Sequence, residues 1–124
     1  MTDTFINFSN HPSAEWSEAQ KNAAVEYGEI VDLQFPVIDE TATDEDIKKL
    51  ADEYLLKVRE IASPNNATVH IMGEQTFTHS LLQRLQRAGY KCVASTTKRI
   101  IEQEGERKVV IFNFERFREY EIFA

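Results

Sequence analysis

Hydrophobic residues recur with two periods along the chain, and the alternation of these periods predicts the order of its secondary-structure elements. Short apolar runs, typical of strands covered on both faces, alternate with stretches whose apolar residues recur every three or four positions, as on one face of a helix. The predicted strands are 5–9, 30–36, 68–72 and 91–95. The predicted helices are 14–27, the stretch from a cap at Thr43 to Ile61, and the stretch from a cap at Thr76 or Thr78 to Gly89.

The stretch after Thr43 carries the clearest helical pattern. A threonine followed three residues later by Asp46 has the spacing of a capping box, with aspartate in the place of glutamate. Ser13 is the predicted cap of the helix before it, which ends at Gly28. One apolar stripe then marks the buried face of the helix after Thr43: Ile47, Leu50, Ala51, Tyr54, Val58 and Ile61.

The pattern changes after residue 98. Two β-branched and aromatic runs, 99–102 and 108–114, flank the segment 104–107, which contains a glycine. This arrangement predicts a β-hairpin with Gly105 in the turn. The last segment, 115–120, alternates aromatic and charged residues and is either an extension of the strand or a tail that faces a partner.

The whole order predicts one α/β domain over residues 1–124. Alternating strands and helices form a parallel sheet with helices on both faces. We therefore expect a small Rossmann-like three-layer domain, with a mainly parallel sheet and a C-terminal β-hairpin at its edge.

Charge narrows the class of partner. The net charge is −7, which argues against a protein that coats long nucleic acids. Residues 1–66 carry 5 Lys/Arg and 14 Asp/Glu, whereas residues 67–124 carry 9 and 7, so the acidity lies in the first half. A small anionic ligand at the second half is compatible with this distribution.

Cysteine content and hydropathy indicate a cytoplasmic protein. The single cysteine, Cys92, lies in an apolar run and has no partner for an internal disulfide. No segment approaches the roughly 20 apolar residues of a membrane span, and the N-terminus lacks the layout of a signal peptide. We expect no membrane association.

Candidate binding residues follow three of the predicted strands. In an open α/β sheet, ligands bind beyond the carboxyl ends of the strands, and the N-terminus of a helix favours an anion there. If the strand order is 2-1-3-4, the polar segments 9–11, 73–76 and 95–99 line one crevice. The predicted ligand-binding residues are Ser9, Asn10, Gly73, Glu74, Thr76, Ser95 and Thr96, and the predicted catalytic residues are His11, Lys98 and Arg99.

Each of these residues also has a purely structural explanation. Ser9 and Asn10 are ordinary turn formers, Gly73 suits a tight turn, and Thr76 suits a helix cap. Hydroxyls and cations at 95–99 also suit a solvated sheet edge. His70 lies inside a strand, where a core histidine with satisfied hydrogen bonds is the better interpretation.

Several site classes find no support in the sequence. The three histidines lack the spacing of zinc ligands and a single cysteine cannot complete a zinc knuckle, so we predict no metal site and no cofactor. The chain contains no P-loop, no dinucleotide-binding fingerprint and no G-x-S-x-G motif.

Three segments, 7–16, 69–74 and 92–99, resemble a known family. They are similar to small stand-alone CRISPR-associated proteins of type III systems, compact CARF-like relatives that include ring nucleases. This resemblance implies a homodimer that binds cyclic oligoadenylate, or another small nucleotide, across its two-fold axis and cleaves it to end the signal.

Metal-free cleavage of such a ring has simple requirements. A ribose 2′-hydroxyl must lie in line with the adjacent phosphate, with donors for the developing charge and a group that moves a proton. Lys98, Arg99 and the backbone amides of 73–76 could stabilise the negative charge that develops on the phosphate, and His11 could move the proton. A carboxylate at Glu74 would repel phosphate unless it binds a hydroxyl or an amine, or points away.

Two other functions stay open at this point. One is a non-enzymatic interaction or ligand-sensing module, with the acidic first half and the aromatic tail as partner surfaces. The other is an enzyme that processes a small nucleotide in a deep pocket of one subunit.

Overall fold

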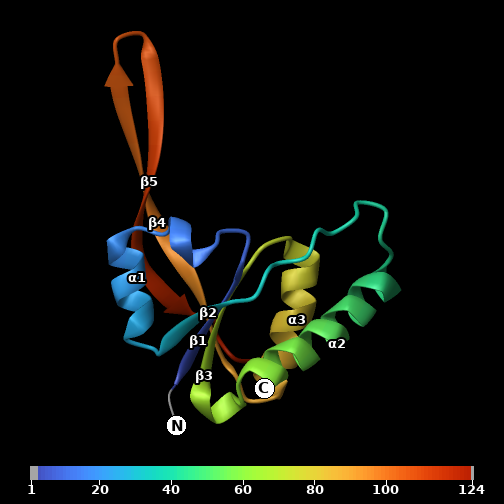
Figure 1. Cartoon of the computed structure of the whole chain (residues 1–124). Coiled ribbons are helices and arrows are strands. Elements are labelled where there is room, and N and C mark those ends of the chain that lie inside the picture. Colours follow the sequence, from blue (N-terminus) through green and yellow to red (C-terminus); the bar gives the residue numbers. More distant parts are fainter. Residues whose placement is uncertain (1–2, 124) are drawn as a thin grey trace.

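A computed structural model describes residues 3–123, which form an α/β domain with one five-stranded sheet (Figure 1). The strands are β1 (Thr4–Ser9), β2 (Glu29–Asp32), β3 (Ala67–Met72), β4 (Lys91–Glu104) and β5 (Arg107–Glu119). The helices are α1 (Glu18–Val25), α2 (Asp44–Ile61) and α3 (Gln75–Arg87), with short 3₁₀ turns η1 (Ser13–Glu15) and η2 (Pro64–Asn66).

The strand order is β2-β1-β3-β4-β5, so the condition under which the three polar segments share one crevice, a 2-1-3-4 order, is met. β1, β2, β3 and β4 pair in parallel, and β5 pairs antiparallel with β4. The sheet is mixed rather than mainly parallel, because the antiparallel ladder runs from Val93 to Glu104 and is longer than any of the parallel ladders. The order of the parallel strands reverses between β1 and β3, which is the point where such sheets bind ligands.

β4 does not end near residue 95, as the sequence predicted, but continues into the hairpin. Antiparallel pairing with β5 carries the strand through to Glu104, where Gly105 turns the chain with φ +61°. A register shift at Thr96/Thr97 leaves Glu115 without a partner, which is a β-bulge. Beyond it β4 and β5 form an arm that leaves the body of the domain (Figure 1).

Helix starts depend on local hydrogen bonds. The capping box of α2 is confirmed, with both the Thr43 and the Asp46 side chains bonded to backbone N–H groups. α1 is shorter than predicted and begins after Ser17, not Ser13, because Trp16 adopts an extended conformation and is buried. Ser17 accepts a hydrogen bond from the backbone N–H of Gln20.

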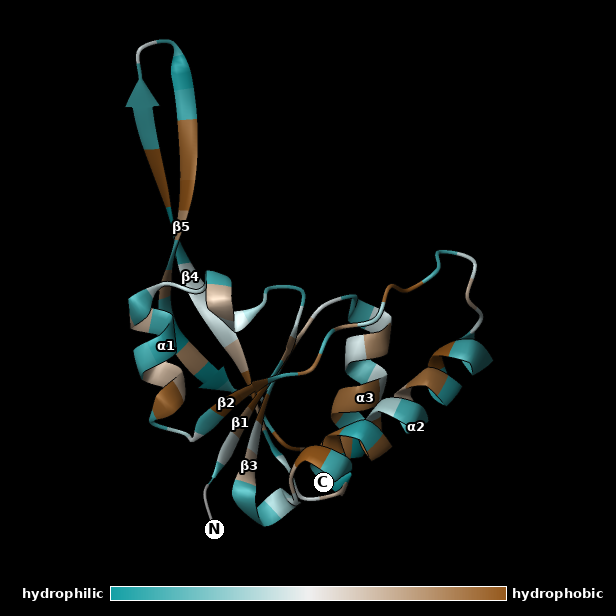
Figure 2. Cartoon of the chain, in the orientation of Figure 1, coloured by the Kyte–Doolittle hydropathy of each residue, from teal (hydrophilic) through white to brown (hydrophobic). Residues whose placement is uncertain are grey.

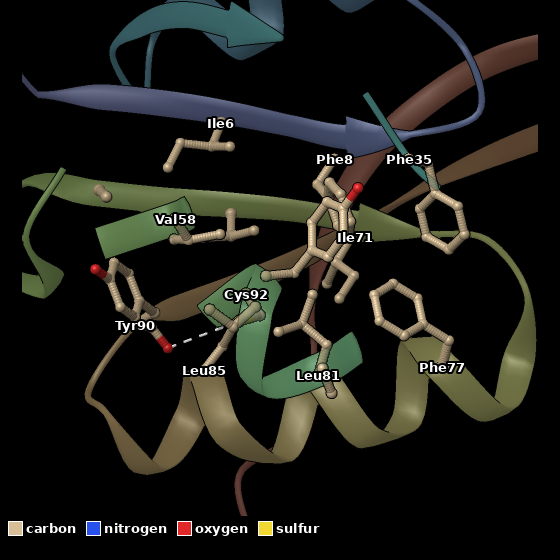
Figure 3. Close-up of a cluster of buried hydrophobic side chains, with 14 residues drawn as sticks. Ile6, Phe8, Phe35, Val58, Ile71, Phe77, Leu81, Leu85, Tyr90 and Cys92 are labelled. Carbon is tan, nitrogen blue, oxygen red and sulfur yellow. Dashed lines mark hydrogen bonds between the residues drawn. The ribbon is translucent and has the colours of Figure 1, made fainter. Parts of the chain in front are cut away.

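Two buried clusters lie on the two faces of the sheet. The larger one fills the space between the sheet and the helices α2 and α3 (Figure 3). The smaller one lies beneath α1 and contains Phe5, Trp16, Ala24, Val93 and Phe117. In β1, Phe5 faces one cluster while Ile6 and Phe8 belong to the other, which explains a strand that is apolar on both faces.

Cys92 belongs to the larger cluster and is buried. Burial raises the pKa of its thiol to about 12, and the charge of Glu119 adds to this effect. The thiol is therefore protonated at neutral pH and acts as a small apolar side chain. Within residues 3–123, no helix is long and apolar enough to cross a membrane.

Candidate functional site

A pocket of about 1030 Å³ opens at the carboxyl ends of β1 and β3 and extends along β4 to the base of the arm. Its wall on one side is the segment from Glu15 to Gln20, and on the other side the segment 112–114 of β5. Four residues of these walls, Trp16, Ala19, Phe112 and Phe114, present apolar surface to it. The pocket lies where the fold places ligands in open α/β sheets.

The structure brings together five of the residues that the sequence proposed. Ser9, Asn10 and His11 after β1, Gly73 after β3 and Ser95 in β4 all line this pocket. The convergence of three polar segments, on which the predicted site depended, is therefore present.

The other five proposed residues lie elsewhere. Glu74 and Thr76 line a smaller pocket of about 560 Å³ beside the loop before α2. Thr96, Lys98 and Arg99 line neither of these two pockets. Side chains alternate along a strand, so Arg99 lies on the same face as Thr97, which lines the larger pocket, whereas Lys98 lies on the opposite face.

Glu74 is the cap of α3, so the prediction that Thr76 or Thr78 caps this helix is wrong. Its carboxylate accepts the backbone N–H of Phe77 at 2.7 Å and the Thr76 hydroxyl at 2.8 Å. These bonds, the Phe77 N–H first, lower the pKa of Glu74. The carboxylate is thus bound to its own helix and does not line the larger pocket, which removes the conflict with an anionic ligand there.

Gly73 has a different role from the one that the sequence suggested. Its φ is not positive, so the turn itself does not require glycine. A Cβ at this position would overlap the aromatic ring of Phe35, a buried residue of the larger cluster. Glycine therefore lets the Phe35 ring pack directly against the backbone beside the pocket.

A row of three polar side chains crosses the sheet beneath the pocket, and sequence reasoning missed it as a site. Asp32, Asn7 and His70 are neighbours in register on β2, β1 and β3. Asn7 Nδ2 donates to Asp32 Oδ1 and to the His11 carbonyl, both at 2.9 Å. Asn7 Oδ1 lies 2.8 Å from Ser9 Oγ and 2.9 Å from His70 Nδ1.

This network holds the polar turn after β1 in place. Asp32 also accepts the Ser13 hydroxyl at 2.9 Å, so β2 is tied to the start of η1. Ser9 accepts the backbone N–H of His11, so its hydroxyl serves the turn, which is the structural role that the sequence offered as an alternative. Polar residues inside two apolar strands were the available signal, but their contact requires the register of the parallel pairing.

His70 forms part of the pocket floor although its side chain is almost fully buried. The Trp16 ring meets it edge-on at a centroid distance of 5.5 Å, and Phe5 stacks on it at 6.0 Å. Burial, and to a smaller extent the charge of His11, lower the pKa of His70 to about 4. The imidazole is therefore neutral at physiological pH.

The part of the chain that the structure describes contains no group of three or more His, Cys, Asp or Glu side chains that could hold a metal ion. A family model described as "Uncharacterized protein MJ1673 family" matches residues 3–118. No curated protein and no solved structure gives a significant match.

Proposed function

We propose that this chain, which belongs to the MJ1673 family, binds a small nucleotide in the larger pocket, and that the nucleotide is a cyclic oligoadenylate. The observation that carries the proposal is the convergence of the polar segments after β1 and β3 with Ser95 of β4 on one pocket. The resemblance of the sequence to CARF-like proteins supplies the identity of the nucleotide. The alternation of strands and helices supports a Rossmann-like domain, and the buried thiol of Cys92 supports a cytoplasmic location in our proposal.

The pocket has the size and the surfaces that a nucleotide needs. Its volume of about 1030 Å³ lies just above the usual range of small-molecule sites, roughly 300–1000 Å³. Phe112 is exposed at the pocket wall and offers an aromatic face on which a base can stack, while the largely buried Trp16 and Phe114 add apolar surface. Asn10 and His11 are exposed at the rim and offer polar contacts for ribose and phosphate.

We further propose that the protein cleaves the ring slowly and without a metal. The ribose 2′-oxygen attacks the adjacent phosphorus, and the bond from phosphorus to the 5′-oxygen breaks. The products are a 2′,3′-cyclic phosphate and a 5′-hydroxyl. His11 moves the proton from the 2′-hydroxyl to the leaving oxygen, and Arg99, on the pocket face of β4, stabilises the developing charge.

A direct assay tests this function. The protein is incubated with cyclic tetra-adenylate and cyclic hexa-adenylate in the presence of a chelator, and the products are separated by chromatography. We expect linear products that end in a 2′,3′-cyclic phosphate. His11→Gln should lower the rate at least tenfold, whereas His79→Gln, an exposed histidine of α3 outside both pockets, should not change it. Absence of binding and of cleavage for both rings would overturn the proposal.

The second candidate is a non-enzymatic module that binds the same ligand or a protein partner. The observation that favours it is the arm, on which Ile101, Val110 and Phe112 expose apolar surface. In this case calorimetry detects binding of a ring while chromatography recovers the ring intact. A homodimer, with Phe112 near both the pocket and the second copy, fits either candidate.

A further inference from the structure

One nitrogen of His70 is a buried hydrogen-bond acceptor without a partner. Nδ1 contacts Asn7, but Nε2 has no hydrogen-bond partner among the described residues and no exposure to solvent. The residue as a whole is 2% exposed. A buried polar atom without a partner costs about 1–3 kcal/mol, so its presence on the floor of a pocket calls for an explanation.

The hydrogen bonds of Asn7 determine which nitrogen of His70 carries the proton. Asn7 Nδ2 contacts the Asp32 carboxylate and the His11 carbonyl, which can only accept. The other amide atom, Oδ1, is therefore the oxygen and must accept a hydrogen bond from an N–H at His70 Nδ1. Since the ring is neutral, its Nε2 carries a free lone pair and can only accept a hydrogen bond.

The ring that carries this lone pair belongs to the floor of the pocket. The two nitrogens point to roughly opposite sides of an imidazole, so with Nδ1 turned to β1, Nε2 is turned away from it. His70 lines the pocket together with Trp16, Met72 and Ser95. Met72 Sδ accepts the Ser95 hydroxyl at 3.1 Å, so that hydroxyl is already used as a donor and does not supply the missing bond to Nε2.

We infer that His70 Nε2 is the acceptor by which the pocket selects its nucleotide, taking a hydrogen bond from a neutral N–H or O–H donor of the ligand. This inference rests on the proposed function and specifies the chemistry of recognition. On an adenine nucleotide the candidate donors are the exocyclic amine and the ribose 2′-hydroxyl. Nε2 is buried in the free protein, so a donor of the ligand, or one bridging water molecule, reaches it only when the pocket side chains around His70 move.

Asn7 and Asp32 are positioning residues in this scheme. Asp32 Oδ1 fixes the orientation of the Asn7 amide, and the amide fixes the tautomer of His70. A charged imidazole would present a donor instead and would repel the same ligand groups. The acceptor is thus set before the ligand arrives, which reduces the ordering cost of binding.

Nitrogen NMR of the imidazole rings tests the inference, because the chain contains only three histidines. In the free protein the Nε2 resonance of His70 should be that of an unprotonated nitrogen. The probes are adenosine monophosphate, inosine monophosphate, which has a carbonyl in place of the amine, and 2′-deoxyadenosine monophosphate. We expect adenosine monophosphate to shift this resonance. If the exocyclic amine is the donor, inosine monophosphate should not shift it; if the 2′-hydroxyl is the donor, 2′-deoxyadenosine monophosphate should not. The resonances of His79 should stay unchanged with every probe.

A matched variant gives the second readout. His70→Phe keeps a ring of similar size but removes the acceptor. It should lower the affinity for cyclic oligoadenylate about tenfold. It should also abolish the preference for adenosine monophosphate over the analogue that fails to shift the Nε2 resonance, which a purely structural role would leave intact.

The outcomes separate this inference from the proposed function. If a cyclic oligoadenylate binds without shifting the Nε2 resonance, the function stands and the role of His70 is overturned. If adenosine monophosphate shifts it but neither ring binds, the role of His70 stands and the proposed ligand is wrong. A protonated Nε2 in the free protein, or no shift with any probe, overturns the inference.

Discussion

At the scale of single residues, the burial of His70 couples the stability of the protein to pH. The pKa of His70 falls from 6.5 to about 4 on folding, mainly because of burial and secondarily because of His11. Between these values the unfolded chain binds more protons than the folded one, so the free energy of unfolding decreases as pH falls. We expect a loss of as much as about 3 kcal/mol between pH 7 and pH 4, measured by urea denaturation.

The His70→Phe variant provides the control for this effect. Between pH 7 and pH 5 it should lose most of the pH dependence, whereas His79→Gln should keep it. Carboxylates with lowered pKa values, such as Asp46 and Glu74, titrate below this window and do not contribute to it. Equal slopes in the wild type and in His70→Phe would contradict the assignment.

Gly73 is expected to be intolerant of substitution because of Phe35 rather than because of its backbone angle. A methyl group at Gly73 would overlap the Phe35 ring and displace it from the larger cluster. Gly73→Ala should destabilise the protein by about 1–3 kcal/mol in urea denaturation. In a Phe35→Leu background the same substitution should cost clearly less, since the smaller side chain can yield. Equal costs in the two backgrounds would mean that the turn itself requires glycine.

At the scale of elements, the cap of α3 is a carboxylate on the residue before the helix. Glu74 accepts the Phe77 N–H and lies near the positive end of the helix dipole. Glu74→Ala should lower the free energy of unfolding by about 1 kcal/mol, the usual cost of losing a cap. Thr76→Val, which keeps the Phe77 bond, should cost less than half as much, and a larger cost for Thr76→Val would assign the cap to the threonine.

How far the sequence predicts an element depends mainly on whether its signal is local. The cap of α3 is an exception, because the sequence offered Thr76 and Thr78, and Glu74 accepts the Phe77 N–H instead. The capping box of α2 and the glycine of the hairpin turn are local, and both are correctly predicted. The start of α1 and the length of β4 are not, because burial of Trp16 and pairing with β5 decide them.

The same distinction applies to the site. The polar turns after β1 and β3 are visible in the sequence as breaks in apolar runs, and the structure brings them together. Asp32, Asn7 and His70 are 25 and 63 residues apart along the chain, counted from Asn7, and only the parallel register makes them neighbours. Their role could not be derived without the pairing of three strands.

At the scale of the whole molecule, the arm of β4 and β5 stands apart because it extends away from the body of the monomer. A two-stranded ribbon is at best marginally stable alone in water. A hydrophobic band nevertheless runs across the arm (Figure 2), and Ile101 and Val110, which pair across it, are 56% and 41% exposed. We propose that a second copy of the chain covers this band.

Removing the arm should therefore separate dimerisation from folding. Replacing residues 99–112 by Asn-Gly joins Lys98 to Asn113, which face each other across the ladder, by a two-residue hairpin loop. Neither buried cluster contains a residue of the deleted segment, so the free energy of unfolding of the body should change by less than about 1 kcal/mol. Analytical ultracentrifugation should find a dimer for the wild type and a monomer for this variant.

Ile101→Lys should also shift the protein toward the monomer, whereas Glu102→Lys, on the opposite face of the arm, should not. A wild type that is monomeric at every concentration, or an armless variant that remains dimeric, would show that the arm serves another purpose.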